Sequence, residues 1–412
     1  MKKYIFLTGS ICNMGGAEQY INKKIQRLKN SGFDAYVFSS RRGNVIIDTL
    51  KEYEKLRFYQ LGLPPYVFSK KFVNKTIEKI CSAIDYSSTD LVHIESTEYG
   101  MAQWGEILAE KISAKHVCII LQEQHSYPSY VQDFLYFKYI RKELYGINEN
   151  SVAQMLPNYE IINNYYIDAE CNNVVDDVPN NCIKELPLSN WNICSIGRLD
   201  KNYVLNGVNE IVTFANSHSN MKINLILVGG GSDGAIELIN KSISRAVNVK
   251  TFITGYLFPI PLDLIMQMDC FFGSAGSSRI PVRYNKPSIS YSAEGECLGI
   301  LNYTTTQTLY KKEGDEKIEM SSLLEEILIN NYCATHQTLG MEREFTDYQK
   351  EFERQLSFFD NSNHDNSYYN FEHKVIMTNK EKVYKFLSFV MGGSLFERFQ
   401  NYLHSMKGEG IK

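Results

Sequence analysis

Three strand-like runs within residues 191–291 each end in residues suited to binding an anion. The first ends in Gly-Arg-Leu-Asp-Lys, which supplies the cations Arg198 and Lys201. The second ends in three glycines at 229–231, and the third in a Ser- and Gly-rich turn at 273–278. Small residues let a backbone approach a ligand closely, and phosphates bind readily to backbone N–H groups and to arginine. If these runs are parallel strands, their ends meet at one edge of a sheet, where ligands of open α/β sheets bind. The pattern therefore predicts a site for an anionic ligand.

The elements that must position these residues alternate between strand-like and helical patterns, which favours a parallel α/β sheet. Residues 16–30 and 101–112 have helical periodicity. The region 160–190 is rich in Asn and has two prolines, which indicates loops and a junction between domains. At 412 residues the chain is too long for one ordinary core, so we expect two domains. The strands are expected near 3–8, 35–39, 90–95, 116–121, 192–196, 223–228, 249–253, 269–273 and 287–291.

Bulk composition excludes several classes of protein. A formal net charge of −4 and a pI of 6.1 argue against a nucleic-acid binder. The nine cysteines include no Cys-x-x-Cys pair, which favours a reducing cytoplasm over a zinc site or a disulfide framework. The apolar run at the N-terminus is too short for a signal peptide, and none approaches the ~18 residues of a membrane span. We therefore expect a cytoplasmic protein that is soluble or peripheral to a membrane.

Four short motifs carry a resemblance to a known family. They are Gly-Gly-Ala-Glu at 15–18, Gly-Arg-Leu-Asp at 197–200, Val-Gly-Gly-Gly at 228–231 and Pro-Ser-Ile at 287–289. Together they resemble the retaining family 4 glycosyltransferases, over residues 1–300 at motif level. The resemblance implies an α/β protein with two Rossmann-like domains (the GT-B fold) and a C-terminal helical tail. It implies an acceptor-side domain at 1–187, a nucleotide-sugar domain at 188–345, and a tail at 346–412 that packs back on the first domain.

The resemblance also implies roles for particular residues. Arg198 and Lys201 would neutralise the donor diphosphate, and fixed cations of this kind stabilise a leaving group. His125 follows an apolar strand and is assigned to the catalytic centre with them. Glu18, His93 and Glu98 are assigned to the acceptor. No Asp-x-Asp occurs in the chain, so we expect no metal and no cofactor beyond the donor itself. The residues assigned to the donor are Gly15, Gly16, Gly229, Gly230, Tyr256, Leu257, Ser274, Gly276, Ser277 and Ser278.

The sequence departs from the family at the positions that hold ribose and diphosphate. The family places a Glu seven residues before the Pro of the Pro-x-Ile strand, and another Glu seven residues earlier. Here these positions are Ile280 and Gly273. The family's Lys position is Tyr203, so Lys201 comes two residues early. Either Glu294 or Glu296 replaces the ribose contact, or the activity is altered or lost.

The function predicted is transfer of a sugar from a nucleotide sugar to a saccharide or polyprenyl-linked acceptor, in bacterial surface polysaccharide synthesis. The reaction would be retaining and metal-independent, at the inner face of the membrane or in the cytoplasm. Nucleic acid is not expected as a partner. Two alternatives stay open: a catalytically inactive GT-B subunit that supports a partner glycosyltransferase, and a GT-B sugar-nucleotide epimerase. An apolar pattern in the tail after residue 380 predicts a core role, with contact to a membrane or a partner as the alternative.

Overall fold

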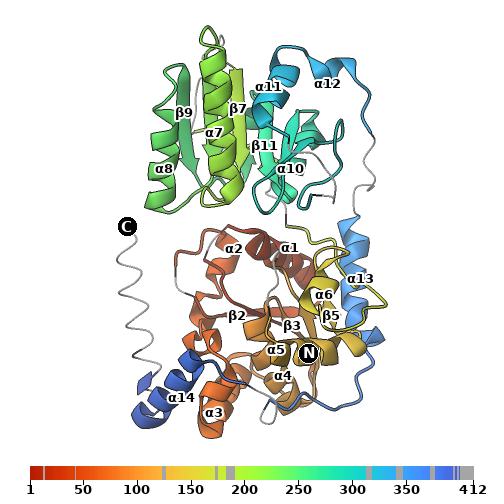
Figure 1. The fold of residues 1–412 in the computed structure, drawn as a ribbon. Coiled ribbons are helices and arrows are strands. Elements are labelled where there is room, and N and C mark those ends of the chain that lie inside the picture. Colours follow the sequence, from red (N-terminus) through yellow and green to blue (C-terminus); the bar gives the residue numbers. More distant parts are fainter. Residues whose placement is uncertain are drawn as a thin grey trace. The chain divides into compact units, whose positions relative to one another are not determined.

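The structure is a computed structural model that describes residues 1–412 except 13, 42, 123–126, 172–174, 182–190, 312–317, 340–346, 372–375, 393–394, 397–398 and 400–412. The chain divides into two compact units. The first unit consists of residues 1–171 with 346–410, and the second of residues 172–345. Each unit is built on a β-sheet of its own, with helices packed against it (Figure 1).

The first unit has a parallel five-stranded sheet in the order β2-β1-β3-β4-β5. Its strands are β1 (Lys2–Thr8), β2 (Asp34–Ser39), β3 (Leu91–Ser96), β4 (Lys115–Ile119) and β5 (Leu144–Tyr145). The helices between them are α1 (Gly16–Asn30), α2 (Asp48–Lys51), α3 (Lys70–Ala83), α4 (Tyr99–Ile112), α5 (Ser129–Ile140) and α6 (Ser151–Met155). Three 3-10 turns also occur, η1 (Glu54–Leu56), η2 (Tyr59–Gly62) and η3 (Pro65–Val67).

The second unit has a six-stranded sheet in the order β13-β12-β11-β7-β8-β9. Five of these strands are parallel, and β13 at the edge is antiparallel to β12. The strands are β7 (Trp191–Ile196), β8 (Ile223–Val228), β9 (Val249–Gly255), β11 (Cys270–Ser274), β12 (Ser288–Tyr291) and β13 (Cys297–Ile300), with a small parallel pair of β6 (Val175–Asp176) and β10 (Ile260–Pro261) beside them. The helices are α7 (Asn202–Ser217), α8 (Asp233–Ile243), α9 (Leu262–Met266), α10 (Gly276–Arg279), α11 (Met320–Leu328) and α12 (Tyr332–Thr335), with one 3-10 turn, η4 (Pro281–Tyr284).

The second sheet is covered on both faces, which is why its strands read as continuous apolar runs. Successive side chains of β7 point to opposite faces. Ile193 belongs to a core with residues of α7, α8 and α11, whereas Cys194 and Ile196 belong to a core with α9 and Ile280. Both cores anchor the strand ends that carry the candidate site.

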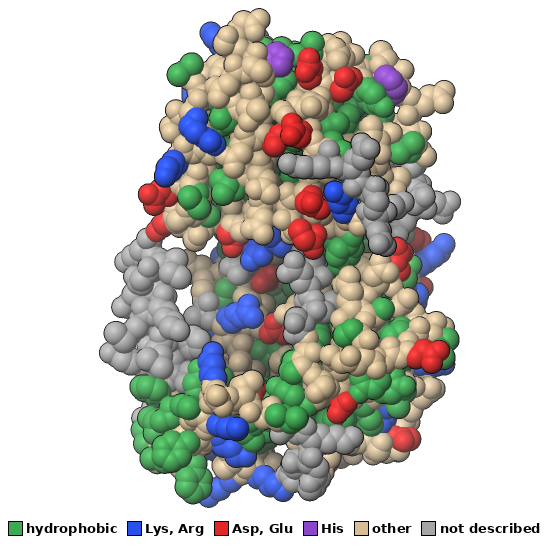
Figure 2. Space-filling model, viewed as in Figure 1, with side chains coloured by type: hydrophobic (Ala, Val, Ile, Leu, Met, Phe, Trp, Pro, Cys, Tyr) green, Lys and Arg blue, Asp and Glu red, His purple; other side chains and the backbone are tan. Residues whose placement is uncertain are grey.

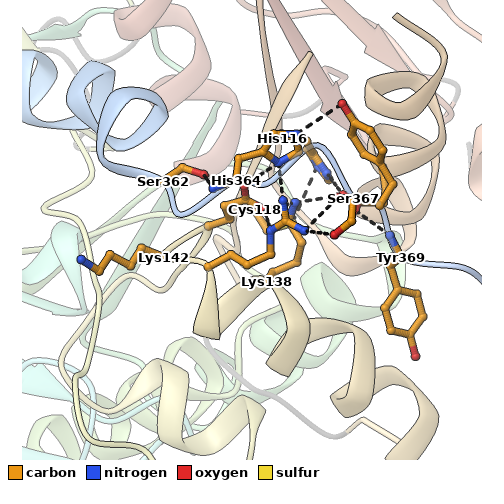
Figure 3. Close-up of polar contacts among 12 residues, drawn as sticks. His116, Cys118, Lys138, Lys142, Ser362, His364, Ser367 and Tyr369 are labelled. Atoms are coloured by element: carbon orange, nitrogen blue, oxygen red, sulfur yellow. Dashed lines mark hydrogen bonds and ion pairs between the residues drawn. The ribbon is translucent and has the colours of Figure 1, made fainter. Parts of the chain in front are cut away.

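The first unit also contains the tail of the chain, through α13 (Tyr348–Asn361) and the segment 362–369. A buried charge cluster fixes this segment (Figure 3). Glu143 accepts a hydrogen bond from Ser362 Oγ at 2.6 Å, and its carboxylate lies 3.2 Å from His364 Nδ1. Arg141 donates to the carbonyl oxygen of Ser367 at 2.8 Å. At the centre, Lys138 Nζ ion-pairs with Glu143 at 2.5 Å.

Glu106 completes the charge cluster from helix α4. Its Oε2 lies 2.9 Å from both Lys138 Nζ and His116 Nδ1, and its Oε1 accepts from the backbone N–H of Tyr369 at 3.0 Å. The polar composition of residues 360–369 is typical of a surface loop, but the side chain of His364 is 5% exposed and reaches inward.

The last described helix, α14 (Asn379–Met391), contacts η3 of the same unit. The expected core role of its apolar residues is wrong for most of them. Val383, Phe386, Phe389 and Val390 are between 54% and 83% exposed. In the described part of the chain, no helix is both long enough and apolar enough to cross a bilayer.

Candidate functional site

The carboxyl ends of the second sheet's parallel strands form one edge, here called the second-sheet edge. From β7 the chain proceeds to β8 and β9 on one side and returns to β11 and β12 on the other. The strand order therefore reverses between β7 and β11, the position where open α/β sheets bind ligands. Phe272 of β11 pairs with Ser195 of β7, so continuing this register brings Ser274 beside Gly197. The two strand ends that the sequence singled out are thus neighbours.

Arg198 and Lys201 lie on the loop that leaves β7 at this edge. The Arg198 side chain is 41% exposed, and its Nε lies 3.9 Å from a carboxylate oxygen of Asp200. At this distance and exposure the pair contributes little, so the guanidinium can exchange Asp200 for a ligand anion. Lys201 is the residue directly before helix α7, and its backbone N–H donates to the carbonyl oxygen of Arg198. Both cations therefore stand at the strand end.

The glycines after β8 permit a close approach of three strand ends. A Cβ on Gly229 would lie 1.8 Å from the carbonyl oxygen of Gly197, and its φ of 153° is rarely adopted by other residues. A Cβ on Gly230 would lie 2.4 Å from the ring of Tyr256. The ring of Tyr256, which follows β9, thus packs directly on the Gly230 backbone. Leu257, the next residue, is partly buried against the apolar core. The close packing gives both glycines an architectural role, and their contact with a donor stays a prediction.

The Ser- and Gly-rich turn after β11 uses its hydroxyl groups internally. Ser277 Oγ donates to the carbonyl oxygen of Ser274 at 2.8 Å and accepts from the Ser274 N–H at 3.3 Å. Ser278 Oγ is buried and donates to the carbonyl oxygen of Ala275 at 2.7 Å. Ser277 and Ser278 were assigned to the donor from the sequence, but their hydroxyl protons are used within the turn. The donors that remain are the first backbone N–H groups of α10, from Gly276 onward, since these have no partner within a helix.

Two residues at this turn were missed by the sequence reasoning. The Arg279 guanidinium donates to Thr308 Oγ1 at 3.3 Å, and the carbonyl oxygen of Thr308 accepts from the Ala275 N–H at 2.5 Å. The segment around 308 therefore lies over the end of β11, and Arg279 is a third cation after the strands of this edge. Ala275 has φ 52°, which is strained for a residue with a side chain and typical of functional turns. A Thr-rich loop gave no sequence signal for this position.

The positions where the family resemblance places its acidic pair and its Lys are occupied by packed residues. Ile280 is 2% exposed in the apolar core, because η4 begins immediately after it at Pro281. Gly273 is buried in β11. Tyr203 is buried in α7, and its hydroxyl lies 2.7 Å from where a Cβ of Gly197 would be. None of these can contact ribose or diphosphate in the family's manner.

Glu294 and Glu296 lie in the turn between β12 and β13, and both are exposed. Between them, Gly295 packs on Asn202, the residue after Lys201, and its carbonyl oxygen accepts from Asn206 Nδ2 at 2.8 Å. The backbone of the turn therefore packs at the start of α7. Glu296 lies 4.0 Å from Lys311 Nζ, a loose and exposed pair.

The first unit has a comparable edge, where the strand order reverses between β1 and β3. The Glu98 carboxylate covers the end of β1, since a Cβ on Gly9 would lie 2.0 Å from its Oε1. Arg41 lies 3.6 Å from Glu98 Oε2. Burial raises the pKa of Glu98, Arg41 opposes this, and the nearby Glu18 adds to it.

Glu18 itself caps helix α1. Its Oε2 accepts from the Gly15 N–H at 3.1 Å, and Gly16 follows as the first residue of the helix. This is one half of a capping box, because Gly15 has no side chain to complete it, and it explains Glu18 without a ligand. It also places Glu18 near Glu98, so two of the three residues assigned to the acceptor come together.

The third such residue, His93, does not join them. It lies in the middle of β3, is 8% exposed, and stacks on Phe359 of α13 with ring centroids 4.2 Å apart. The expectation that His93 lies at a strand end and meets an acceptor is therefore wrong. Burial lowers its pKa to about 4, against an opposing effect of Asp360. His125 lies outside the described residues.

The second-sheet edge can thus hold an anion between fixed cations and backbone donors, with carboxylates nearby for hydroxyl groups. Within the described ranges, no group of three or more His, Cys, Asp and Glu side chains is arranged to hold a metal ion. None of the eight cysteines that the structure describes forms a disulfide.

No protein-family model matches this sequence, and no curated protein sequence matches it. Solved structures do resemble the fold. A mutant of TarM from S. aureus, bound to fondaparinux, alpha-GlcNAc-glycerol and UDP, has 10% identity and a TM-score of 0.56 over 87% of this chain and 100% of its own. A glycosyltransferase from Rickettsia africae has 14% identity and a TM-score of 0.57 over 87% and 97%. Anabaena HepE, in complex with UDP-glucose, has 14% identity and a TM-score of 0.55 over 86% and 99%. The α/β fold class expected from the sequence, with two Rossmann-like domains of GT-B type, is confirmed.

Proposed function

We propose that the protein is a glycosyltransferase that moves a sugar from a nucleotide-sugar donor to a saccharide acceptor. One observation carries the proposal: Arg198 and Lys201 after β7 stand beside the Ser274–Arg279 turn after β11, at the point where the strand order reverses. A diphosphate is the anion that such a pair of strand ends fits best. Two structures of similar fold hold UDP or UDP-glucose, which supports a donor of that chemistry.

The chemistry would rest on positioning and on charge. As the sugar leaves, negative charge grows on the diphosphate, and Arg198, Lys201 and Arg279 are fixed cations that can stabilise it. They supply the positive charge that a metal ion supplies elsewhere, so we propose a metal-independent reaction. We propose retention of configuration on the family resemblance, with the acceptor hydroxyl attacking from the donor's own face.

Recognition of the nucleoside is assigned to two loops. The backbone at Tyr256 and Leu257, next to Gly229 and Gly230, would contact the base. Glu294 or Glu296 would accept hydrogen bonds from the ribose hydroxyls, since the turn between them packs at the start of α7. This contact would replace the absent family Glu at Ile280.

The acceptor is assigned to the first unit, at Glu98 and Glu18. The partly buried Glu98 carboxylate beside Arg41 can accept hydrogen bonds from sugar hydroxyls, and its raised pKa also suits a proton acceptor. We propose a saccharide or polyprenyl-linked saccharide of bacterial surface polysaccharide synthesis as the acceptor. The reaction would then take place in the cytoplasm, at the inner face of the membrane.

A second candidate function is that of an inactive GT-B subunit supporting a partner glycosyltransferase. The burial of Ile280 and Gly273 favours it, because the usual ribose contact has no counterpart there.

Isothermal titration calorimetry with UDP-, GDP- and dTDP-sugars separates the two candidates. The enzyme requires binding of at least one donor, weakened roughly 10- to 100-fold by Arg198→Ala, since a charge-assisted hydrogen bond contributes about 1.5–3 kcal/mol. Arg245→Ala is the matched control: this exposed Arg follows the end of α8, and its guanidinium bonds to Asn209. Absence of binding to every donor would support the inactive subunit.

A further inference from the structure

Helix α14 has its apolar face turned outward. One side of the helix is fixed to η3, where Ser388 Oγ donates to the carbonyl oxygen of Val67 at 2.6 Å. On the same side, Glu381 accepts from Tyr66 Oη at 2.8 Å. The opposite side carries Val383, Phe386 and Val390, spaced three and four residues apart and 54%, 65% and 63% exposed. A surface helix ordinarily exposes polar residues to solvent, so this arrangement indicates that the apolar side binds a partner.

The exposed face continues beyond the helix. Phe389 is 83% exposed, and Ile376 and Leu395, on either side of α14, are 71% and 58% exposed. Phe396, by contrast, is fully buried beside Phe68. Figure 2 shows the apolar side chains gathered in one area at the lower left of the view. A contiguous apolar area of this kind marks an interaction surface. We call residues 376, 383, 386, 389, 390 and 395 the α14 surface.

Lysines surround the α14 surface. Helix α14 itself carries Lys380, Lys382 and Lys385, all exposed. Helix α3 begins shortly after η3, the 3-10 turn that α14 contacts. It carries four more exposed lysines, at 70, 71, 75 and 79. Each helix carries a single glutamate, at 78 and 381, so the area is strongly cationic in a chain whose net charge is −4.

We propose that the α14 surface binds an anionic phospholipid bilayer, with Phe386 and Phe389 in the acyl–headgroup boundary and the flanking lysines on the headgroups. Aromatic and aliphatic residues on one face with lysines beside them are the composition of a helix that lies in a membrane interface. A protein groove would also cover the apolar residues, but a broad lysine border complements an anionic lipid surface more directly. The proposal deepens the location given under the proposed function, but it involves no residue of the donor site.

The test is co-sedimentation of the full chain with vesicles of phosphatidylcholine, with or without phosphatidylglycerol. We expect binding to the anionic vesicles, weaker binding to phosphatidylcholine alone, and a decrease with added salt. Phe386→Ser/Phe389→Ser should lower the partition coefficient at least tenfold on both vesicles. The control Ile140→Ser/Ile162→Ser also removes two exposed apolar side chains, 53% and 83% exposed, and should have no effect.

A charge-reversal pair tests the lysine border. Lys382→Glu/Lys385→Glu should reduce binding to the anionic vesicles by at least roughly fivefold per lysine, with little change on phosphatidylcholine alone. Lys222→Glu/Lys241→Glu, on exposed lysines of the second unit, is the control. UDP binding measured on each variant separates this proposal from the donor site, because it should be unchanged.

Three results would overturn the proposal. The first is an absence of binding to any vesicle, and the second is an equal loss of binding in the control variants. The third is a dimer in sedimentation velocity that becomes a monomer in Phe386→Ser/Phe389→Ser without vesicle binding, since a second copy would then cover the surface.

Discussion

Replacing Lys138 by Met tests whether the buried charge cluster holds the first unit together. Lys138 Nζ lies 2.9 Å from Glu106 Oε2 and 2.5 Å from Glu143 Oε2, and the three side chains are 1%, 2% and 0% exposed. Met preserves much of the apolar stem of Lys, so the substitution removes mainly the charge. Two carboxylates would then remain buried without their shared cation.

The size of the effect follows from three contributions. At an effective dielectric constant of about 20, an ion pair at these distances is a gross attraction of roughly 6 kcal/mol. Much of this is offset, because burying a lysine charge itself costs several kcal/mol. A carboxylate left without Lys138 can also take up a proton instead of staying charged. For a carboxyl of ordinary pKa this costs about 4 kcal/mol at pH 7, which limits the loss of stability per carboxylate. We expect the free energy of unfolding to fall by about 3–5 kcal/mol at pH 7.

The loss should depend on pH in a definite direction. Burial opposes ionisation of Glu106, but Lys138 and His116 outweigh it and hold the pKa of this carboxyl well below its ordinary value. A lowered carboxyl pKa gives stability that is present above the unfolded value and lost as the pH falls. Without Lys138 the carboxylates can protonate instead, at a cost of only about 1 kcal/mol at pH 5. The difference in free energy of unfolding between wild type and Lys138→Met should therefore become roughly 2–3 kcal/mol smaller between pH 7 and pH 5.

The assay must report on the first unit, because a two-domain chain need not unfold in one step. The chain has two tryptophans, and Trp104 is fully buried on α4, the helix that carries Glu106. Urea unfolding followed by Trp104 fluorescence in a Trp191→Phe background gives the required value. Lys142→Met is the control, because Lys142 is exposed and extends away from the cluster (Figure 3), so its effect should stay within about 0.5 kcal/mol. A loss below about 1 kcal/mol at pH 7, or one that does not shrink at pH 5, would refute the reasoning.

Three further predictions concern the fold and the donor site. Burial lowers the pKa of His93 to about 4, whereas in the unfolded state this residue takes up a proton as the pH falls below about 6.5. The free energy of unfolding should therefore decrease by up to about 1.4 kcal/mol per pH unit over this range. Unfolding of His93→Phe between pH 7 and pH 4 should show a flatter slope, and equal slopes would exclude this role. Gly230→Ala should weaken UDP-sugar binding about tenfold in calorimetry, because the new methyl group would displace the ring of Tyr256. The control Gly234→Ala lies on a helix with open space around it, so binding should not change. This control should raise the free energy of unfolding by up to about 1 kcal/mol. Of Glu294→Gln and Glu296→Gln, one should reduce UDP affinity about tenfold and the other not at all; if neither does, the ribose is held elsewhere.

The strand ends at the second-sheet edge could be predicted because they depend on local sequence. Apolar runs that end in Gly-Arg or Gly-Gly-Gly identify a buried parallel strand and the loop after it, and parallel strands must share an edge. The same reasoning recognised that Ile280 departs from the family pattern, and the structure explains the departure through the Pro281 turn and core burial.

Long-range packing could not be predicted in this way. His93 looked accessible because strand periodicity does not reveal that Phe359, far along the chain, covers that half of β3. The pairing of Lys138 and Glu143 with His364 likewise leaves no periodic signal. For α14, an apolar face in the sequence looks the same whether it is buried or exposed. The hydroxyls of Ser277 and Ser278 were misassigned because composition does not say whether a turn satisfies its own hydrogen bonds.

A crystal structure with a bound UDP-sugar tests the central claim most directly. The account predicts the diphosphate at the second-sheet edge, within hydrogen-bonding distance of the Arg198 guanidinium and the backbone N–H groups of Gly276 and Ser277. It also predicts a ribose hydroxyl on Glu294 or Glu296. A nucleotide bound away from β7 and β11, or one that leaves Arg198 paired with Asp200, would contradict the account.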